Sequence, residues 1–147
     1  MTRRILGDGP VAVDTSVFIY FIERHPTWLP IVRPLFAEAS TGHRTLVSSA
    51  ITLLEVLVVP YRNGDLAIAE RYEGLLTRSR GLALVEVDQH ILRASAQLRA
   101  VYRLRTADAI QIASALSQRC TAFVTNDHRL PEIKGLKIVR LADLETA

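Results

Sequence analysis

The sequence has only one cysteine, Cys120, and only two lysines, Lys134 and Lys137, among its 18 basic residues. A single cysteine excludes an intramolecular disulfide, and its place before the apolar residues 122–124 is typical of a small buried side chain. The scarcity of lysine means that the positive charge is nearly all arginine, whose planar guanidinium binds phosphate through paired hydrogen bonds. An arginine-rich genome would give the same bias. With a net charge of only +3, the composition therefore favours a nucleic-acid partner weakly.

Long apolar runs are also absent from the sequence. The longest, residues 50–59, is interrupted by Glu55 and stopped by Pro60, so no segment reaches the roughly 20 residues that a membrane span needs. Arg3 and Arg4 resemble the start of a secretion signal, but no apolar core follows them. We therefore expect a cytoplasmic protein without a membrane segment.

Short β-branched runs alternate with longer segments of helical period, which is typical of an α/β domain with a parallel sheet. The five predicted strands are residues 11–13, 45–48, 82–87, 121–125 and 137–140. The six predicted helices are residues 17–23, a segment whose apolar face covers 29–39, residues 50–62, residues 66–78, a segment from the Asp88 cap through Tyr102, and residues 107–118. The chain has 147 residues and no repeat or linker, so we predict a single domain spanning residues 1–147.

The predicted helix starts carry residues that commonly cap helices. Thr15 or Ser16 is expected to cap the first helix, Ser49 the third, and Thr106 the last. Asp108 then lies in the first turn of the last helix.

Four acidic side chains lie on or directly beside strongly apolar runs. Asp14 and Asp127 end the first and fourth predicted strands, Glu55 interrupts an apolar helix, and Asp108 begins the stretch 109–113. A carboxylate taken out of water costs several kcal/mol, as an order of magnitude, unless it is paired or bound to a metal. Loops that leave the carboxyl ends of parallel strands open on one edge of the sheet. We therefore expect the four carboxylates to converge there.

Carboxylate oxygens are the ligands that Mg²⁺ and Mn²⁺ prefer, whereas four scattered histidines and the lack of a Cys-x-x-Cys motif argue against zinc. Four bare carboxylates would repel a phosphodiester, but the same site would attract it once a divalent cation is bound. We therefore predict a metal site formed by Asp14, Glu55, Asp108 and Asp127.

Each carboxylate also has a purely structural explanation. Asp14 and Asp127 are in positions where aspartate commonly caps a helix, and Asp108 in a first turn would complement the helix dipole by about 0.3–1 kcal/mol. Glu55 fits such an explanation poorly, because apolar residues at helical spacing surround it. A buried ion pair with an arginine such as Arg105 is its remaining alternative. Taken together, the four favour the metal site.

These residues belong to an ordered set of motifs that resembles a PIN-domain ribonuclease. The set comprises Asp14-Thr15-Ser16 after the first strand, Glu55 on an apolar helix, Thr106-Ala107-Asp108-Ala109 at a helix start, and Thr125-Asn126-Asp127 after the fourth strand. Its length and spacing most resemble the VapC-type toxins of toxin–antitoxin pairs, and the likeness spans residues 11–140. It implies a Rossmann-like PIN domain with a five-stranded parallel sheet in the order 3-2-1-4-5 and helices on both faces.

The resemblance also implies an activity. The protein would be a Mg²⁺- or Mn²⁺-dependent endoribonuclease in which a metal-activated water attacks an RNA phosphodiester. The four carboxylates would be both the catalytic residues and the metal ligands. Ser16 and Thr125 would support them through their hydroxyls, and Arg105 is a candidate contact for the RNA.

The resemblance further implies two partners, a cognate VapB-type antitoxin and a second copy of the chain in a homodimer. A cluster of aromatic and apolar residues near the end of the first helix would suit an antitoxin interface, although core packing explains such residues equally well. The cluster consists of Tyr20, Phe21, Trp28 and Leu29. Two alternatives are a PIN nuclease of RNA processing that is not a toxin, and a catalytically silent PIN-fold module that binds RNA or protein.

Overall fold

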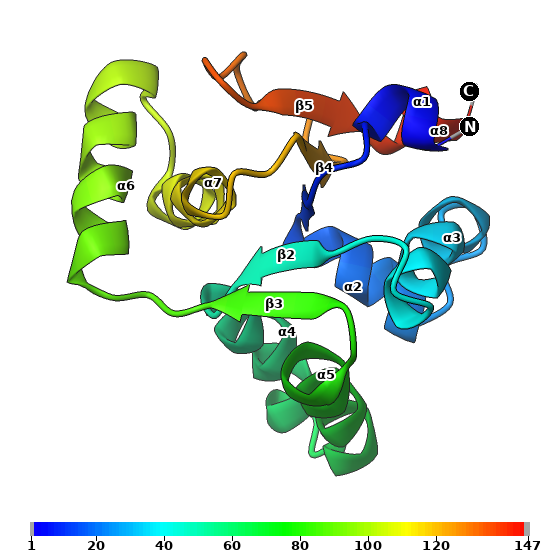
Figure 1. Cartoon of the computed structure of the whole chain (residues 1–147). Helices are drawn as coiled ribbons and strands as arrows, with labels where there is room; N and C mark the ends of the chain where they lie inside the picture. The colour runs from blue at the N-terminus through cyan, green and yellow to red at the C-terminus, as the bar shows by residue number, and fades with distance from the viewer. Residues whose placement is uncertain (1, 146–147) are drawn as a thin grey trace.

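The computed structural model describes residues 2–145 and is built on a five-stranded sheet (Figure 1). The strands are β1 (Val11–Val13), β2 (Leu46–Ser49), β3 (Leu82–Val85), β4 (Ala122–Thr125) and β5 (Lys137–Arg140). Their order across the sheet is β3-β2-β1-β4-β5, and every neighbouring pair runs parallel. The predicted fold class and strand order are therefore confirmed. The predicted domain boundaries, residues 1 and 147, lie outside the described residues.

The helices within residues 2–145 are α1 (Thr2–Leu6), α2 (Thr15–Ile22), α3 (Leu29–Ser40), α4 (Ile51–Arg62), α5 (Leu66–Arg78), α6 (Gln89–Tyr102), α7 (Thr106–Ser117) and α8 (Leu141–Glu145). The six predicted helices correspond to α2 through α7. The prediction misses α1 and α8, which have five residues each and are too short to be stable without tertiary contacts. Those contacts come from Leu6, Leu141 and Leu144, which are buried in the core.

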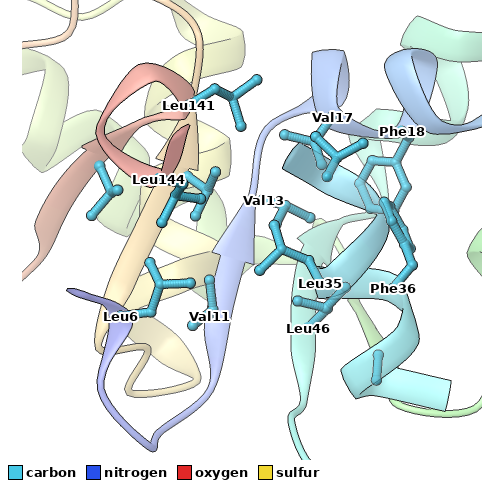
Figure 2. Packing of buried hydrophobic residues seen from close by; sticks show 14 of the residues in the cluster. Leu6, Val11, Val13, Val17, Phe18, Leu35, Phe36, Leu46, Leu141 and Leu144 are labelled. Atoms are coloured by element: carbon cyan, nitrogen blue, oxygen red, sulfur yellow. The ribbon is translucent and has the colours of Figure 1, made fainter. Parts of the chain in front are cut away.

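Alternate residues of the strands face opposite sides of the sheet, and each side has its own core. Val11 and Val13 belong to one cluster, which includes side chains of α2, α3 and α5. Ala12, between them, belongs to a second cluster with Ile112 of α7. Figure 2 shows part of the first cluster, in which Leu6 of α1 lies beside Val11 of β1, while Leu141 and Leu144 project from α8. Helices therefore cover both faces of the sheet, as predicted.

Three of the predicted caps are wrong by at least one residue. Helix α4 begins at Ile51, with Ala50 and not Ser49 in the N-cap position. Helix α2 begins at Thr15, with Asp14 in the N-cap position, and α7 begins at Thr106, with Arg105 in the N-cap position. Both cap residues have extended backbones, and neither side chain makes a capping hydrogen bond. The hydroxyl of Thr15 is instead bonded to other side chains in the interior. The side chains of these helix starts therefore serve contacts with other segments.

Two further expectations concern the membrane and the cysteine. None of the helices within residues 2–145 is long and apolar enough to cross a membrane. Cys120 is buried, as predicted, and its burial raises the pKa of the thiol to about 12. The thiol therefore stays protonated and unreactive at neutral pH.

The start of β3 provides a test of how closely α3 packs on the sheet. Gly81 has a φ of +82°, and a Cβ added there would lie 2.2 Å from the carbonyl oxygen of Ala39. We expect Gly81→Ala to lower the free energy of unfolding in urea by more than about 2 kcal/mol. The matched control is Gly64→Ala, where φ is +66° and a Cβ meets nothing within 4 Å, so only about 1 kcal/mol of backbone strain is expected. Equal losses would mean that the close approach to α3 contributes nothing.

Candidate active site

Asp14 lies at the carboxyl end of β1, in the centre of the sheet, where its backbone amide donates to the carbonyl of Val124 in β4. Its Oδ2 accepts a 2.6 Å hydrogen bond from the hydroxyl of Thr125. Burial raises the pKa of this carboxyl, although hydrogen bonds from Thr125 and from the Thr15 backbone act in the opposite direction. Its side chain caps no helix, so capping does not explain why a carboxylate is found here.

Thr125 connects two of the predicted carboxylates. This side chain is fully buried at the end of β4, and its hydroxyl donates to Asp14 while it accepts from the backbone amide of Asp127 at 2.9 Å. The next residue, Asn126, donates to the hydroxyl of Tyr20 in α2 at 3.1 Å. The loop after β4 is therefore held against the end of β1 and against α2, which places Asp127 on the same edge of the sheet as Asp14.

Glu55 projects from α4 toward the same edge and is held by a buried polar network. Its Oε1 accepts from the hydroxyl of Thr15 at 2.7 Å and from Nε2 of Gln111 at 3.4 Å. Gln111 also donates to the hydroxyl of Thr52 at 2.8 Å, and its own carbonyl accepts from the backbone amide of Ser49. The network thus joins β2, α2, α4 and α7 beneath one carboxylate.

The expectation that buried apolar residues surround Glu55 is wrong. Leu54 and Val59, its neighbours on α4, are 65% and 54% exposed, and Glu55 is itself exposed. The helix turns this apolar side outward, because its buried face is formed by Thr52, Val56 and Pro60 instead. An exposed apolar surface therefore lies beside the candidate site.

Asp108 and Asp127 are both paired with arginine. Arg105 reaches Asp108 with its Nε at 3.1 Å and Asp127 with its Nη2 at 3.4 Å. Arg129 donates to both oxygens of Asp127, and this pairing is the main reason why the pKa of Asp127 is lowered. Arg105 therefore pairs with these two aspartates, and no arginine within residues 2–145 forms an ion pair with Glu55, which argues against the ion-pair explanation.

The four carboxylates lie at one edge of the sheet, but they do not form a preformed metal-binding site. The negative charges of Asp108 and Glu55 help to raise the pKa of Asp14, so both lie close enough to act on its carboxyl. Nevertheless, no three His, Cys, Asp or Glu side chains among residues 2–145 are grouped so that they could hold a metal ion. The arginines engage the oxygens of Asp108 and Asp127 at this edge.

The donor atoms at this edge suit a hard divalent cation. They are carboxylate oxygens, together with the hydroxyl of Ser16, which is buried and has no hydrogen-bond partner. A buried hydroxyl without a partner costs about 1–3 kcal/mol, which a water or ligand at this position would recover. Ser16 is thus placed where the sequence predicts a supporting hydroxyl, while its role stays a prediction.

Sequence reasoning missed the residues that hold Glu55. Gln111 and Thr52 are almost fully buried, although each lies within an apolar run of its helix. A polar residue inside an apolar helical segment is a signal that it needs a partner. That signal does not say which partner, because Gln111 and Thr52 are 59 residues apart.

A comparison with family models matches residues 11–136 of the chain to the PIN domain. The chain belongs to the PIN domain family. This match confirms the family predicted from the four motifs, and it covers most of this PIN domain's sequence.

Solved structures of toxin–antitoxin proteins share the fold of this PIN domain. A DNA-bound VapBC complex from Salmonella typhimurium matches with a TM-score of 0.63 and 24% identity, covering 90% of this chain and 98% of that one. VapC20 from Mycobacterium tuberculosis, a toxin that cleaves the sarcin-ricin loop, matches with a TM-score of 0.66 and 14% identity over 84% and 98% of the two chains. A toxin–antitoxin complex from Klebsiella pneumoniae matches with a TM-score of 0.64 and 21% identity over 86% and 94%. A comparison with the curated proteins found no significant match.

The buried network of this PIN domain predicts an unequal response to two substitutions in α7. Gln111→Leu nearly keeps the volume of the side chain but removes its hydrogen bonds with Thr52, Glu55 and the Ser49 amide, so we expect it to lower the free energy of unfolding by about 1–3 kcal/mol. Ser114→Ala is the control, because that buried hydroxyl bonds only to the Ile110 carbonyl of the same helix. Urea unfolding of both variants measures the difference. A Gln111→Leu variant as stable as Ser114→Ala would contradict a network that stabilises the fold.

The raised pKa of Asp14 predicts the effect of removing its charge. A carboxyl whose pKa is raised by folding favours the folded state most at pH values below its pKa in the unfolded chain. This contribution is lost as the pH rises through the raised pKa of the folded state. At neutral pH without divalent cations, ionised Asp14 therefore costs stability, and Asp14→Asn should melt at a higher temperature.

Thermal unfolding in chelator, followed by circular dichroism across the acidic and neutral range, measures this effect. Each kcal/mol of gain is worth about 2–4 °C for a chain of this size, and the gain should vanish at acidic pH. Asp65→Asn is the control, because Asp65 accepts from the Ile68 amide as the exposed cap of α5. A lower melting temperature for Asp14→Asn at neutral pH would favour a structural role for the ionised carboxylate.

Proposed function

We propose that this PIN domain is a cytoplasmic Mg²⁺- or Mn²⁺-dependent endoribonuclease that acts as the toxin of a VapBC-type toxin–antitoxin pair. The observation that carries the proposal is the gathering of Asp14, Glu55 and Asp108 at the carboxyl end of the central strands, where burial raises the pKa of the Asp14 carboxyl and the charges of Asp108 and Glu55 act in the same direction. An ionised carboxylate that is withdrawn from water beside like charges lowers stability, so a protein that keeps it gains from a ligand that neutralises it. A divalent cation is such a ligand.

The residues that would hold the cation are Asp14, Glu55, Asp108 and Asp127. A divalent cation bound there would lower the pKa of a coordinated water, and it would compensate the negative charge that develops on a phosphodiester during hydrolysis. The chain itself does the positioning. Thr125 fixes the orientation of Asp14, and the Thr15 and Gln111 side chains fix that of Glu55.

Two observations support an RNA substrate: the positive charge of exposed arginines at the site, and the similarity of the fold to that of VapC20. Without a cation, the carboxylates at this edge repel phosphate, but Arg105 and Arg129 stand at their border with more than half of each side chain exposed. VapC20, which shares the fold, is a toxin that cleaves the sarcin-ricin loop. Both support single-stranded or loop RNA as the substrate class, since such RNA can present its phosphates to a site at the rim of a domain.

A VapB-type antitoxin is the proposed regulatory partner. Tyr20 and Trp28 stack with their ring centroids 6.3 Å apart, and Tyr20 is bonded to the loop that carries Asp127. Both side chains are only partly buried, and aromatic residues of this kind commonly anchor protein interfaces. A partner that covers them would lie beside the candidate site and would restrict access to it.

A homodimer is the second proposed assembly. Helix α4 exposes Leu54, Val58 and Val59 next to Glu55, and contiguous apolar surface of this kind is common at interfaces between copies of a chain. Association through α4 would bring the two candidate sites of a dimer near one another.

The test of the proposed activity compares the purified wild type with Asp14→Asn and Glu55→Gln on structured RNAs such as tRNA. We expect the wild type to cleave in Mg²⁺ or Mn²⁺ and to stop in chelator, and we expect each variant to lose at least about 100-fold in rate. Cleavage is followed on denaturing gels. Asp65→Asn, which changes an exposed helix cap, should cleave like the wild type.

The other outcomes of this comparison are also informative. Equal cleavage by the wild type and Asp14→Asn would point to a contaminating nuclease and would reject the assignment. Tight binding of RNA without any cleavage would favour a catalytically silent module.

A further inference from the structure

Two arginines already neutralise the outer part of the candidate active site. Arg105 bridges Asp108 and Asp127, with Nε at 3.1 Å from the first and Nη2 at 3.4 Å from the second. Arg129 meets Asp127 with two donors, Nε at 3.0 Å and Nη2 at 3.2 Å. These aspartates therefore meet guanidinium groups where the proposed function requires a cation.

These ion pairs are easily exchanged. The side chains of Arg105 and Arg129 are 64% and 71% exposed, whereas those of Asp108 and Asp127 are only 22% and 18% exposed. A pair with an exposed partner changes an equilibrium constant by about fivefold at most, because water and salt screen it. A divalent cation can therefore displace the arginines while the more buried aspartates stay in place.

A cavity of about 330 Å³ lies beside the ion pairs. Arg103, Arg105 and Arg129 line it together with Asp108 and Asp127, and Tyr102 adds an aromatic side chain. Arg103 forms no ion pair in the part of the chain that the structure describes. Once a cation takes the two carboxylates, three guanidinium groups are left in the cavity without an anionic partner there.

We propose that this cavity, the arginine pocket, binds a backbone phosphate of the RNA next to the phosphate that is cut. Arg105 and Arg129 become available to that neighbouring phosphate when a divalent cation replaces them on Asp108 and Asp127. The inference rests on the proposed function and assigns a substrate contact to the same site. Guanidinium suits this exchange, because its fork of donors fits a carboxylate and a phosphate in the same way.

The exchange couples the two ligands. A cation that frees the arginines strengthens the binding of RNA, and RNA that occupies the arginines strengthens the binding of the cation by the same factor. Arg103 differs from the other two, because it is available to a phosphate whether or not a cation is bound. The three arginines therefore make separable predictions.

The first experiment measures Mn²⁺ binding without RNA, by electron paramagnetic resonance, for the wild type and for Arg105→Gln, Arg129→Gln and Arg78→Gln. Removing an arginine that competes for Asp108 or Asp127 should tighten Mn²⁺ binding about two- to fivefold. Arg78→Gln is the matched control, since Arg78 is itself similarly exposed and pairs with Glu70 on α5, which is none of the four carboxylates. It should bind Mn²⁺ like the wild type.

The second experiment measures the affinity of a short single-stranded RNA with and without Mn²⁺, by stopped-flow fluorescence anisotropy that reads binding before cleavage. Mn²⁺ should steepen the salt dependence of wild-type RNA affinity, by about 0.7 in the logarithmic slope for each new phosphate contact. Arg105→Gln and Arg129→Gln should each lose part of this steepening. Arg103→Gln should instead weaken RNA binding both with and without Mn²⁺.

The outcomes separate this inference from the function on which it rests. If the wild type binds Mn²⁺ but Arg105→Gln and Arg129→Gln bind it no more tightly, or keep the full steepening with RNA, the exchange is overturned and the proposed nuclease stands. If the wild type binds no Mn²⁺, both the cation-dependent function and the exchange are overturned.

Discussion

The candidate site depends on the hydrogen bond between the hydroxyl of Thr125 and the carboxylate of Asp14. Asp14 is largely withdrawn from water at the end of the central strand, and Asp108 and Glu55 add negative charge near it. The Thr125 hydroxyl, itself fully buried, partly compensates this cost and fixes the direction of the carboxylate. Because the same hydroxyl accepts from the Asp127 amide, one side chain sets the relation between the ends of β1 and β4.

Most of the architecture is encoded in patterns that can be read locally. The β-branched runs gave four strands within one or two residues of their ends, while the strand at Leu82–Val85 is shorter than expected because its last two residues leave the sheet. Helices α1 and α8 were missed because Leu6, Leu141 and Leu144 stabilise them only through contacts with the core. The order of the strands came from the family resemblance, since no local pattern specifies which strands pair.

The carboxylates of the site were predictable because charges beside apolar runs are costly, but their environments were not. Glu55 is exposed beside Leu54 and Val59, although its neighbours in sequence suggested burial. The roles of Gln111 and Thr52 depend on the hydrogen bond between them, which joins residues 59 positions apart in the chain. Arg129 resembles an ordinary solvated loop residue in sequence, and only the fold shows that it holds Asp127 with two donors.

The bond between Thr125 and Asp14 joins residues that are 111 positions apart. During synthesis, β1 is translated early, but one of its two neighbouring strands, β4, is translated late. The central part of the sheet therefore stays incomplete until β4 has been made. Until then the Asp14 carboxylate lacks its buried hydroxyl partner, and Asp127 does not yet exist. A nascent chain therefore carries no assembled acidic edge until most of its length has been made.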